Sequence, residues 1–152
     1  MSEDINKTAS TAGIYSFNQF RSSIEKEIEN YFKQSSVLYL FELEYRIKNI
    51  NEDEKNRQLY NGFIIKTINK YVRKGQDFFT VDDSGRFITL FNRILSNLAF
   101  MIVNKIVNEI KDQFGDKITV YVGSAECPRD GSNFNELMST SNYNLKKNKY
   151  SD

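Results

Sequence analysis

The segment FFTVDDSGRFITLF, residues 78–91, determines how the rest of the chain is arranged. Its two ends, 78–81 and 87–91, are rich in aromatic and β-branched residues, which favour strands. The polar residues between them, 82–85, include Gly85, which can adopt the positive φ that many tight turns require. The segment therefore predicts an antiparallel β-hairpin. A turn with two acids, a glycine and a following arginine also suits a functional site, although most such turns are purely structural.

Composition excludes several kinds of chemistry. The chain has 152 residues, enough for one domain, a net charge of +1 and no histidine. Without histidine there is no imidazole acid–base catalysis or imidazole metal site, so a metal would need oxygen ligands. The single cysteine, Cys127, excludes an intrachain disulfide and fits a reducing compartment, so we expect a cytoplasmic protein. The near-zero charge argues against a nucleic-acid partner, and the longest apolar run, 98–103, is too short for membrane insertion.

The N-terminal part divides into a polar segment and a helix. Residues 1–13 are small, polar and aperiodic, which predicts a disordered tail or linker before a domain over 14–152. A helix is predicted within 14–34, where Ser16 and Gln19 form a capping box. Its apolar positions make one narrow stripe: Phe17, Phe20, Ile24, Ile28 and Tyr31. Such a stripe suits packing against the chain's own domain or against a partner.

Strands and helices alternate along the remainder. Residues 36–43 predict a buried strand, at whose end Glu42 and Glu44 point to one face. The other predicted elements are a helix capped by Asn51 and Glu54 and ended before Gly75, the hairpin, a helix over 92–114, a strand over 117–123, and a helix capped by Asn133 and Glu136. This order predicts an α/β (α+β) fold with a mixed, largely antiparallel sheet and helices on both faces.

Taken together, these segments resemble a GGDEF domain, the fold of diguanylate cyclases, over residues 16–149. The strand 38–43 followed by Glu44 is similar to the family's first strand, which ends in Asp-x-Asp, with Glu42 at the metal-binding position. The other matching segments are 83–87 at the signature Gly-Gly-Asp/Glu-Glu-Phe, 74–77 at the inhibitory Arg-x-x-Asp, 118–125 at Thr-x-Ser-x-Gly-x-Ala, and 128–147 at the closing loop and helix.

The departures from the family pattern fall on the residues that its chemistry needs. Asp83 and Ser84 replace two glycines that let the backbone approach a phosphate. Gly85 and Arg86 replace two acids, of which the resemblance implies that the first helps to hold Mg²⁺. Only Phe87 of the signature is kept, which leaves Glu42, with its neighbour Glu44, as a vestigial metal site without catalytic residues.

The inhibitory site is altered as well. Lys74 replaces the arginine of the family motif and cannot make its bidentate contacts, whereas Asp77 is kept. The family's guanine-reading Asn and Asp have no clear counterparts. The resemblance thus implies a degenerate GGDEF domain that needs no metal or other cofactor.

The functional expectation is a catalytically inactive regulatory module in bacterial signalling, acting through a protein partner or self-association along the stripe of the first helix. One alternative is a nucleotide sensor, which would bind cyclic di-GMP near Lys74 and Asp77 or GTP in the former cleft. A weak diguanylate cyclase is a further alternative. Because the first strand and the hairpin lie side by side in this fold, we also predict an ion pair from Arg86 to Glu42 or Glu44. The alternative is an Arg86 side chain that points into solvent.

Overall fold

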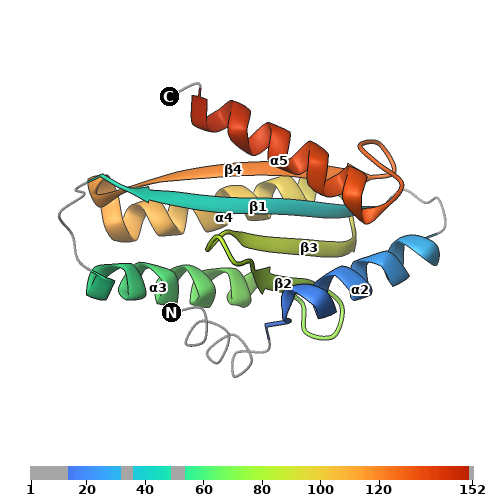
Figure 1. The fold of residues 1–152 in the computed structure, drawn as a ribbon, viewed down its shortest axis with the longest axis horizontal. Coiled ribbons are helices and arrows are strands. Elements are labelled where there is room, and N and C mark those ends of the chain that lie inside the picture. The colour runs from blue at the N-terminus through green and yellow to red at the C-terminus, as the bar shows by residue number, and fades with distance from the viewer. Residues whose placement is uncertain (1–13, 32–35, 49–53, 151–152) are drawn as a thin grey trace.

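A computed structural model describes residues 14–31, 36–48 and 54–150. The predicted tail 1–13 and the predicted cap residue Asn51 lie outside the described residues. The elements are α2 (Phe17–Glu29), β1 (Val37–Ile47), α3 (Glu54–Tyr71), β2 (Phe78–Val81), β3 (Phe87–Ile94), α4 (Ser96–Phe114), the short 3₁₀ helix η1 (Gly115–Lys117), β4 (Ile118–Cys127) and α5 (Phe134–Tyr150) (Figure 1). The predicted order of helices and strands is confirmed.

The four strands form one sheet in the order β2-β3-β1-β4, and its three strand pairings are all antiparallel. The predicted α+β fold with a largely antiparallel sheet and helices on both faces is confirmed, and within the described residues the pairings are antiparallel throughout rather than mixed. Strands β1 and β2 run in the same direction but are separated by β3, and α3 connects them. The same arrangement recurs for β3, α4 and β4 around β1. Two interleaved split βαβ units thus build the sheet.

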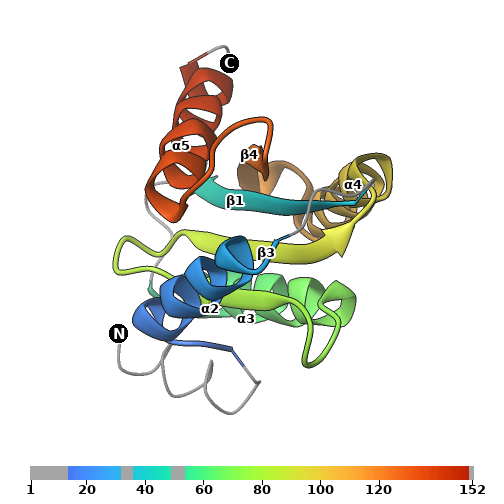
Figure 2. The same ribbon diagram turned by 90° about the vertical axis from the view of Figure 1, so that its right-hand side faces the viewer.

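Each face of the sheet has its own core because successive strand residues point to opposite sides. On β1, Phe41 and Leu43 face a core that α3 and α4 cover, whereas Leu38 and Leu40 face a core that α2 and α5 cover. Figure 2 shows the helices in these two layers, with the strands between them. Glu42 and Glu44 lie on the side of α2 and α5.

Helix α2 begins with the predicted capping box between Ser16 and Gln19. Its apolar stripe packs on the domain itself, because Phe20 and Ile24 are fully buried in the core beneath α2 and α5. The remaining stripe residues are partly buried against that core: Phe17, Ile28 and Tyr31. The expected partner surface is therefore largely covered by the chain's own sheet and α5, and a partner would have to contact its edges.

Several element boundaries differ from the predicted ones. Strand β3 continues to Ile94, which pairs with Val37, so α4 begins at Ser96 rather than at residue 92. Two apolar residues of the predicted helix, Leu98 and Met101, point outward with exposed fractions of 46% and 55%. Leu59 of α3 is exposed as well. None of the helices that the structure describes combines the length and apolar character needed to cross a bilayer.

Candidate functional site

The turn of the hairpin is held by one carboxylate. Asp82 Oδ1 accepts hydrogen bonds from the backbone N–H of Ser84 and of Arg86, both at 2.9 Å, and from the Ser84 hydroxyl. Gly85 has a φ of +84°, as its place in the turn predicted, and its N–H donates to the carbonyl of Asp82. Asp83 is exposed. The turn is thus closed by local interactions, three of which use Asp82 Oδ1 as the acceptor.

Arg86 connects the turn to both acids of β1. In the β1–β3 register Glu42 lies opposite Ile88, so Arg86, two residues earlier and immediately before β3, projects from the same face beside Glu44. Arg86 Nη1 donates to Glu42 Oε2 at 3.0 Å, and Arg86 Nη2 donates to Glu44 Oε1 at 3.3 Å. The predicted ion pair is confirmed, and the alternative of an arginine in solvent was wrong because the Arg86 side chain is only 19% exposed.

Glu42 is a buried acid at the centre of this arrangement. Its side chain has no exposed surface, and its Oε1 accepts no hydrogen bond from the residues that the structure describes. Burial raises the pKa of Glu42, although the neighbouring Ser141 and Arg86 act in the opposite direction. Lys149 of α5 contacts Glu44 from the other side. Two cations therefore balance two acids.

This donor set does not fit a magnesium site. Mg²⁺ needs about six oxygen ligands in octahedral geometry, most of them water or carboxylate oxygens. Here one oxygen of Glu42 is bound by the Arg86 guanidinium, and Gly85 brings no side-chain ligand from the turn. In the described ranges no group of three or more His, Cys, Asp or Glu side chains is placed to hold a metal ion.

The structure separates the two residues expected at the inhibitory site. Lys74 is exposed, whereas the Asp77 side chain is fully buried. Asp77 accepts hydrogen bonds from Arg73 N, Nε and Nη2 and from Asn92 N, all between 2.8 and 2.9 Å. It thereby ties the end of α3 to β3. The arginine of this pair is Arg73, which sequence reasoning overlooked although its i, i+4 spacing to Asp77 permits the contact.

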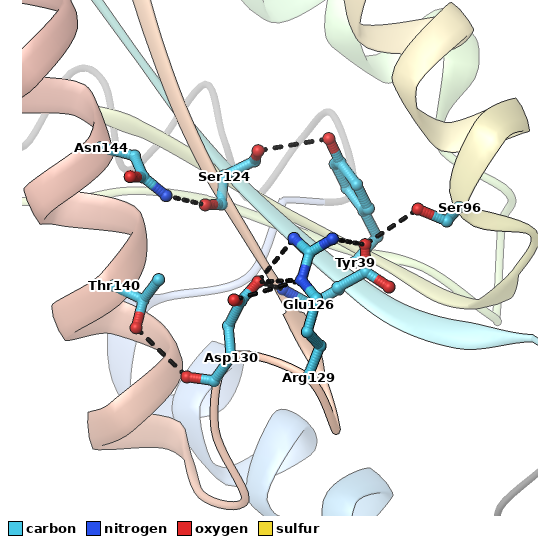
Figure 3. A network of polar contacts seen from close by, with 8 residues as sticks. All are labelled: Tyr39, Ser96, Ser124, Glu126, Arg129, Asp130, Thr140 and Asn144. Carbon is cyan, nitrogen blue, oxygen red and sulfur yellow. Dashed lines mark hydrogen bonds and ion pairs between the residues drawn. The ribbon is translucent and has the colours of Figure 1, made fainter.

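A second polar network lies on the outer strand β4, next to the start of α4 and along α5 (Figure 3). Glu126, 6% exposed, accepts from Ser96 Oγ at 2.8 Å and pairs with Arg129 at 3.2 Å. Asp130 accepts from the backbone N–H of Glu126 at 2.9 Å, and its carbonyl accepts from Thr140 Oγ1. These contacts fix the loop after β4 against α5, beside an open polar cavity of about 540 Å³.

Sequence reasoning missed this network. With Tyr39, which donates to Ser124, its residues come from four segments, and the only local signal was the Pro-Arg-Asp-Gly loop at 128–131, which was interpreted as a loop alone.

Comparison with known proteins adds evidence on the fold. No protein-family model matches the sequence, and no curated protein does. Among solved structures, a sensory box/GGDEF family protein from Caulobacter crescentus is 14% identical, with a TM-score of 0.76 over 92% of this chain and 96% of that chain.

Two further structures agree with this comparison. The GGDEF domain of YfiN from Pseudomonas aeruginosa is 14% identical, with a TM-score of 0.76 over 93% of both chains. The GGDEF domain of DgcB from Caulobacter crescentus, in complex with c-di-GMP, is 14% identical, with a TM-score of 0.75 over 91% of this chain and 86% of that chain. The chain thus has the fold of GGDEF domains, as the resemblance implied.

Proposed function

We propose that this chain, which has the fold of GGDEF domains, is a catalytically inactive regulatory module that acts through protein–protein interaction in bacterial signalling, in the cytoplasm. One observation carries the proposal: the Arg86 guanidinium lies between Glu42 and Glu44, where the resemblance implies a metal ion. The Arg86 guanidinium occupies one oxygen of each carboxylate and Lys149 contacts the second oxygen of Glu44, so only Glu42 Oε1 is left among these four oxygens for a metal.

The chemistry of the family explains why this change matters. Joining two nucleoside triphosphates requires metal ions that neutralise charge on the transferred phosphoryl group and its leaving group. In this chain Gly85 stands in place of the signature acid, and another acid of the turn, Asp82, closes the turn itself through Oδ1. A positively charged guanidinium beside Glu42 also disfavours a divalent cation there through charge repulsion.

The backbone of the turn departs from a phosphate-binding turn as well. Two glycines would leave their N–H groups open to a phosphate, whereas Asp83 and Ser84 carry side chains at these positions. The exposed Asp83 adds a negative charge, which repels a triphosphate, and the Ser84 N–H already donates to Asp82. These features support a loss of substrate binding in addition to a loss of metal binding.

A nucleotide sensor is the second candidate. Its support is that the solved structures include the GGDEF domain of DgcB in complex with c-di-GMP, and that Lys74 is exposed in this chain. Against it, Asp77 is buried and occupied by Arg73 and Asn92. Binding at this position would require Asp77 to exchange internal partners for ligand, so we expect weak binding or none.

The proposal is tested by incubating the full chain with GTP and Mg²⁺ or Mn²⁺ and measuring cyclic di-GMP, with an active diguanylate cyclase as positive control. We expect no product. Product that disappears in Glu42→Ala would overturn the proposal. Thermal shift against GTP and cyclic di-GMP, with and without Mg²⁺, tests the sensor candidate, which gains support if either nucleotide stabilises the chain and Lys74→Ala removes the effect.

A further inference from the structure

The first two turns of α4 expose an apolar surface that the fold does not explain. Four large side chains are 46–59% exposed, of which the first precedes α4 as its N-cap and the others lie in the helix: Leu95, Leu98, Phe100 and Met101. We call these four residues the α4 patch. Around the helix, Met101 lies between Leu98 and Phe100, because successive residues are about 100° apart. Figures 1 and 2 show α4 on the side of the sheet away from α2 and α5, where no other described element covers its outer surface.

The two halves of α4 differ in a way that indicates a covered surface. No charged residue occurs from Ile94 to Asn104, and the outer face of the helix in this part carries large apolar side chains beside the neutral Asn97 and Asn104. The second half has the usual charged outer face, with Lys105, Lys111 and Asp112 exposed. A surface helix of a globular protein normally has charged and polar residues on the face opposite the core, so large apolar residues there indicate a covered surface. The second half of α4 lacks this apolar outer face, so the need for a covering surface is confined to the α4 patch.

We propose that the α4 patch is a two-fold interface between two copies of this chain, in which the first halves of the two α4 helices pack antiparallel with Met101 near the axis. The inference rests on the proposed interaction role, for which it names the partner and the surface. It does not depend on the loss of cyclase activity.

The area of the α4 patch fits such an interface. Taking about 200 Å² for each large side chain, the exposed fractions correspond to on the order of 400 Å² of apolar surface. A standard interface buries about 800 Å² on each partner, of which about 500 Å² is apolar. The patch thus supplies most of the apolar area that one partner contributes.

The charge of the α4 patch favours a second copy over a partner of opposite charge. In a two-fold pair every residue meets the same surface on the other chain, so a charged patch would repel itself. The outward polar residues within this part of the helix are the neutral Asn97 and Asn104, which can donate to and accept from each other. The net charge of +1 for the chain adds little long-range repulsion between copies.

Sedimentation equilibrium of the full chain over a range of concentrations tests the inference. We expect a dimer whose Kd rises at least about tenfold in Met101→Glu, because the change places two like charges at the axis. Leu59→Glu is the matched control, since Leu59 is an exposed leucine on α3 beside Tyr60, which contacts Phe114 at the far end of α4. That control should associate as the unchanged chain does, and circular dichroism should show both variants folded.

Cysteine cross-linking supplies a second measurement. Met101→Cys should form an interchain disulfide on mild oxidation, whereas Leu59→Cys should not, and the native Cys127 is buried. A chain that is monomeric at every concentration, or a dimer indifferent to Met101→Glu, would overturn the inference. A monomer that binds anionic lipid vesicles through the α4 patch, and so sediments with them, would also overturn the inference, because the patch would then be a membrane-binding surface.

The two proposals fail differently. A dimer through α4 that also makes cyclic di-GMP from GTP would refute the proposed loss of activity and leave the interface standing. A monomer that makes no cyclic di-GMP would refute the α4 interface and leave the proposed loss of activity standing.

Discussion

Replacing Arg86 by methionine tests how Glu42 is stabilised. Methionine keeps much of the length and apolar stem of the arginine but removes both donors to β1. Glu42, with no exposed surface, would then lose the 3.0 Å contact to Oε2, and its Oε1 already accepts no hydrogen bond from the described residues. The variant therefore leaves a carboxylate inside the protein without its main partner.

The size of the effect follows from this burial. Removing one partner of a buried ion pair costs about 3–5 kcal/mol, and an exposed pair contributes under about 1 kcal/mol. Glu42 belongs to the first class, whereas Arg86, at 19% exposure, and Glu44, at 25%, retain some contact with water. We therefore expect Arg86→Met to lower the free energy of unfolding by about 3 kcal/mol near neutral pH.

The effect should depend on pH. Burial raises the pKa of Glu42 in the folded protein, so the folded state holds this proton more tightly than the unfolded state does. Stability from this group is therefore greatest below the unfolded pKa of Glu42 and is lost as the pH rises through the folded pKa. Because Arg86 lowers the pKa of Glu42, that pKa is higher still in Arg86→Met, and the variant continues to lose stability up to a higher pH than the original chain does. The two proteins should differ little at about pH 4 and most at about pH 8.

Urea unfolding followed by circular dichroism at these two pH values measures the difference. Adding Glu42→Gln to the variant should recover part of the stability and remove the additional pH dependence. The exposed pair between Arg21 and Glu25 is the matched control, and Arg21→Met should change stability by under about 0.5 kcal/mol. A loss below about 1 kcal/mol for Arg86→Met, equal at both pH values, would refute the reasoning, since it would mean that water solvates Glu42.

Three further predictions concern packing and buried contacts. In Gly123→Ala the added Cβ would lie 2.3 Å from the backbone nitrogen of Leu145, so α5 must shift. Urea unfolding should show that the free energy of unfolding falls by about 2 kcal/mol. Unchanged stability would contradict the close approach of α5 to β4. Asp77→Asn removes charge-assisted hydrogen bonds from Arg73 and should lower the free energy of unfolding by about 2 kcal/mol. An unchanged urea midpoint of unfolding would show that the buried pair contributes little. Phe20→Ser should lower the free energy of unfolding by about 4 kcal/mol and leave the oligomeric state in size-exclusion chromatography unchanged. If the variant is as stable as the original chain but associates differently, Phe20 belongs to a partner surface instead.

The sequence was sufficient for the features that depend on local chemistry. The order of elements follows from hydrophobic periodicity, and the capping box at Ser16 and Gln19 follows from side chains three residues apart. Gly75, Gly85 and Gly115 all have positive φ at places where a helix or strand was predicted to end. The contact of Arg86 with Glu42 needed the resemblance, which placed the first strand beside the hairpin.

The features that were missed depend on contacts between distant segments. Periodicity showed that Leu98 and Met101 are apolar but not which side of α4 the sheet covers. The buried state of Asp77 depends on Asn92, which reaches it only after β2 and β3 have paired. The network around Glu126 joins segments that no local pattern connects.

The position of Arg86 between two strands has a consequence for folding specificity. Arg86 and Glu42 are separated by 44 residues, so they meet only when β3 aligns with β1 in the observed register. A slip by one residue would turn the arginine to the opposite face, against the apolar core that contains Phe79 and Phe87. The misaligned sheet would bury a guanidinium without an acid and, on the other face, a carboxylate without a cation. The pair therefore selects one alignment of the two central strands over its neighbours, whatever its net contribution to stability.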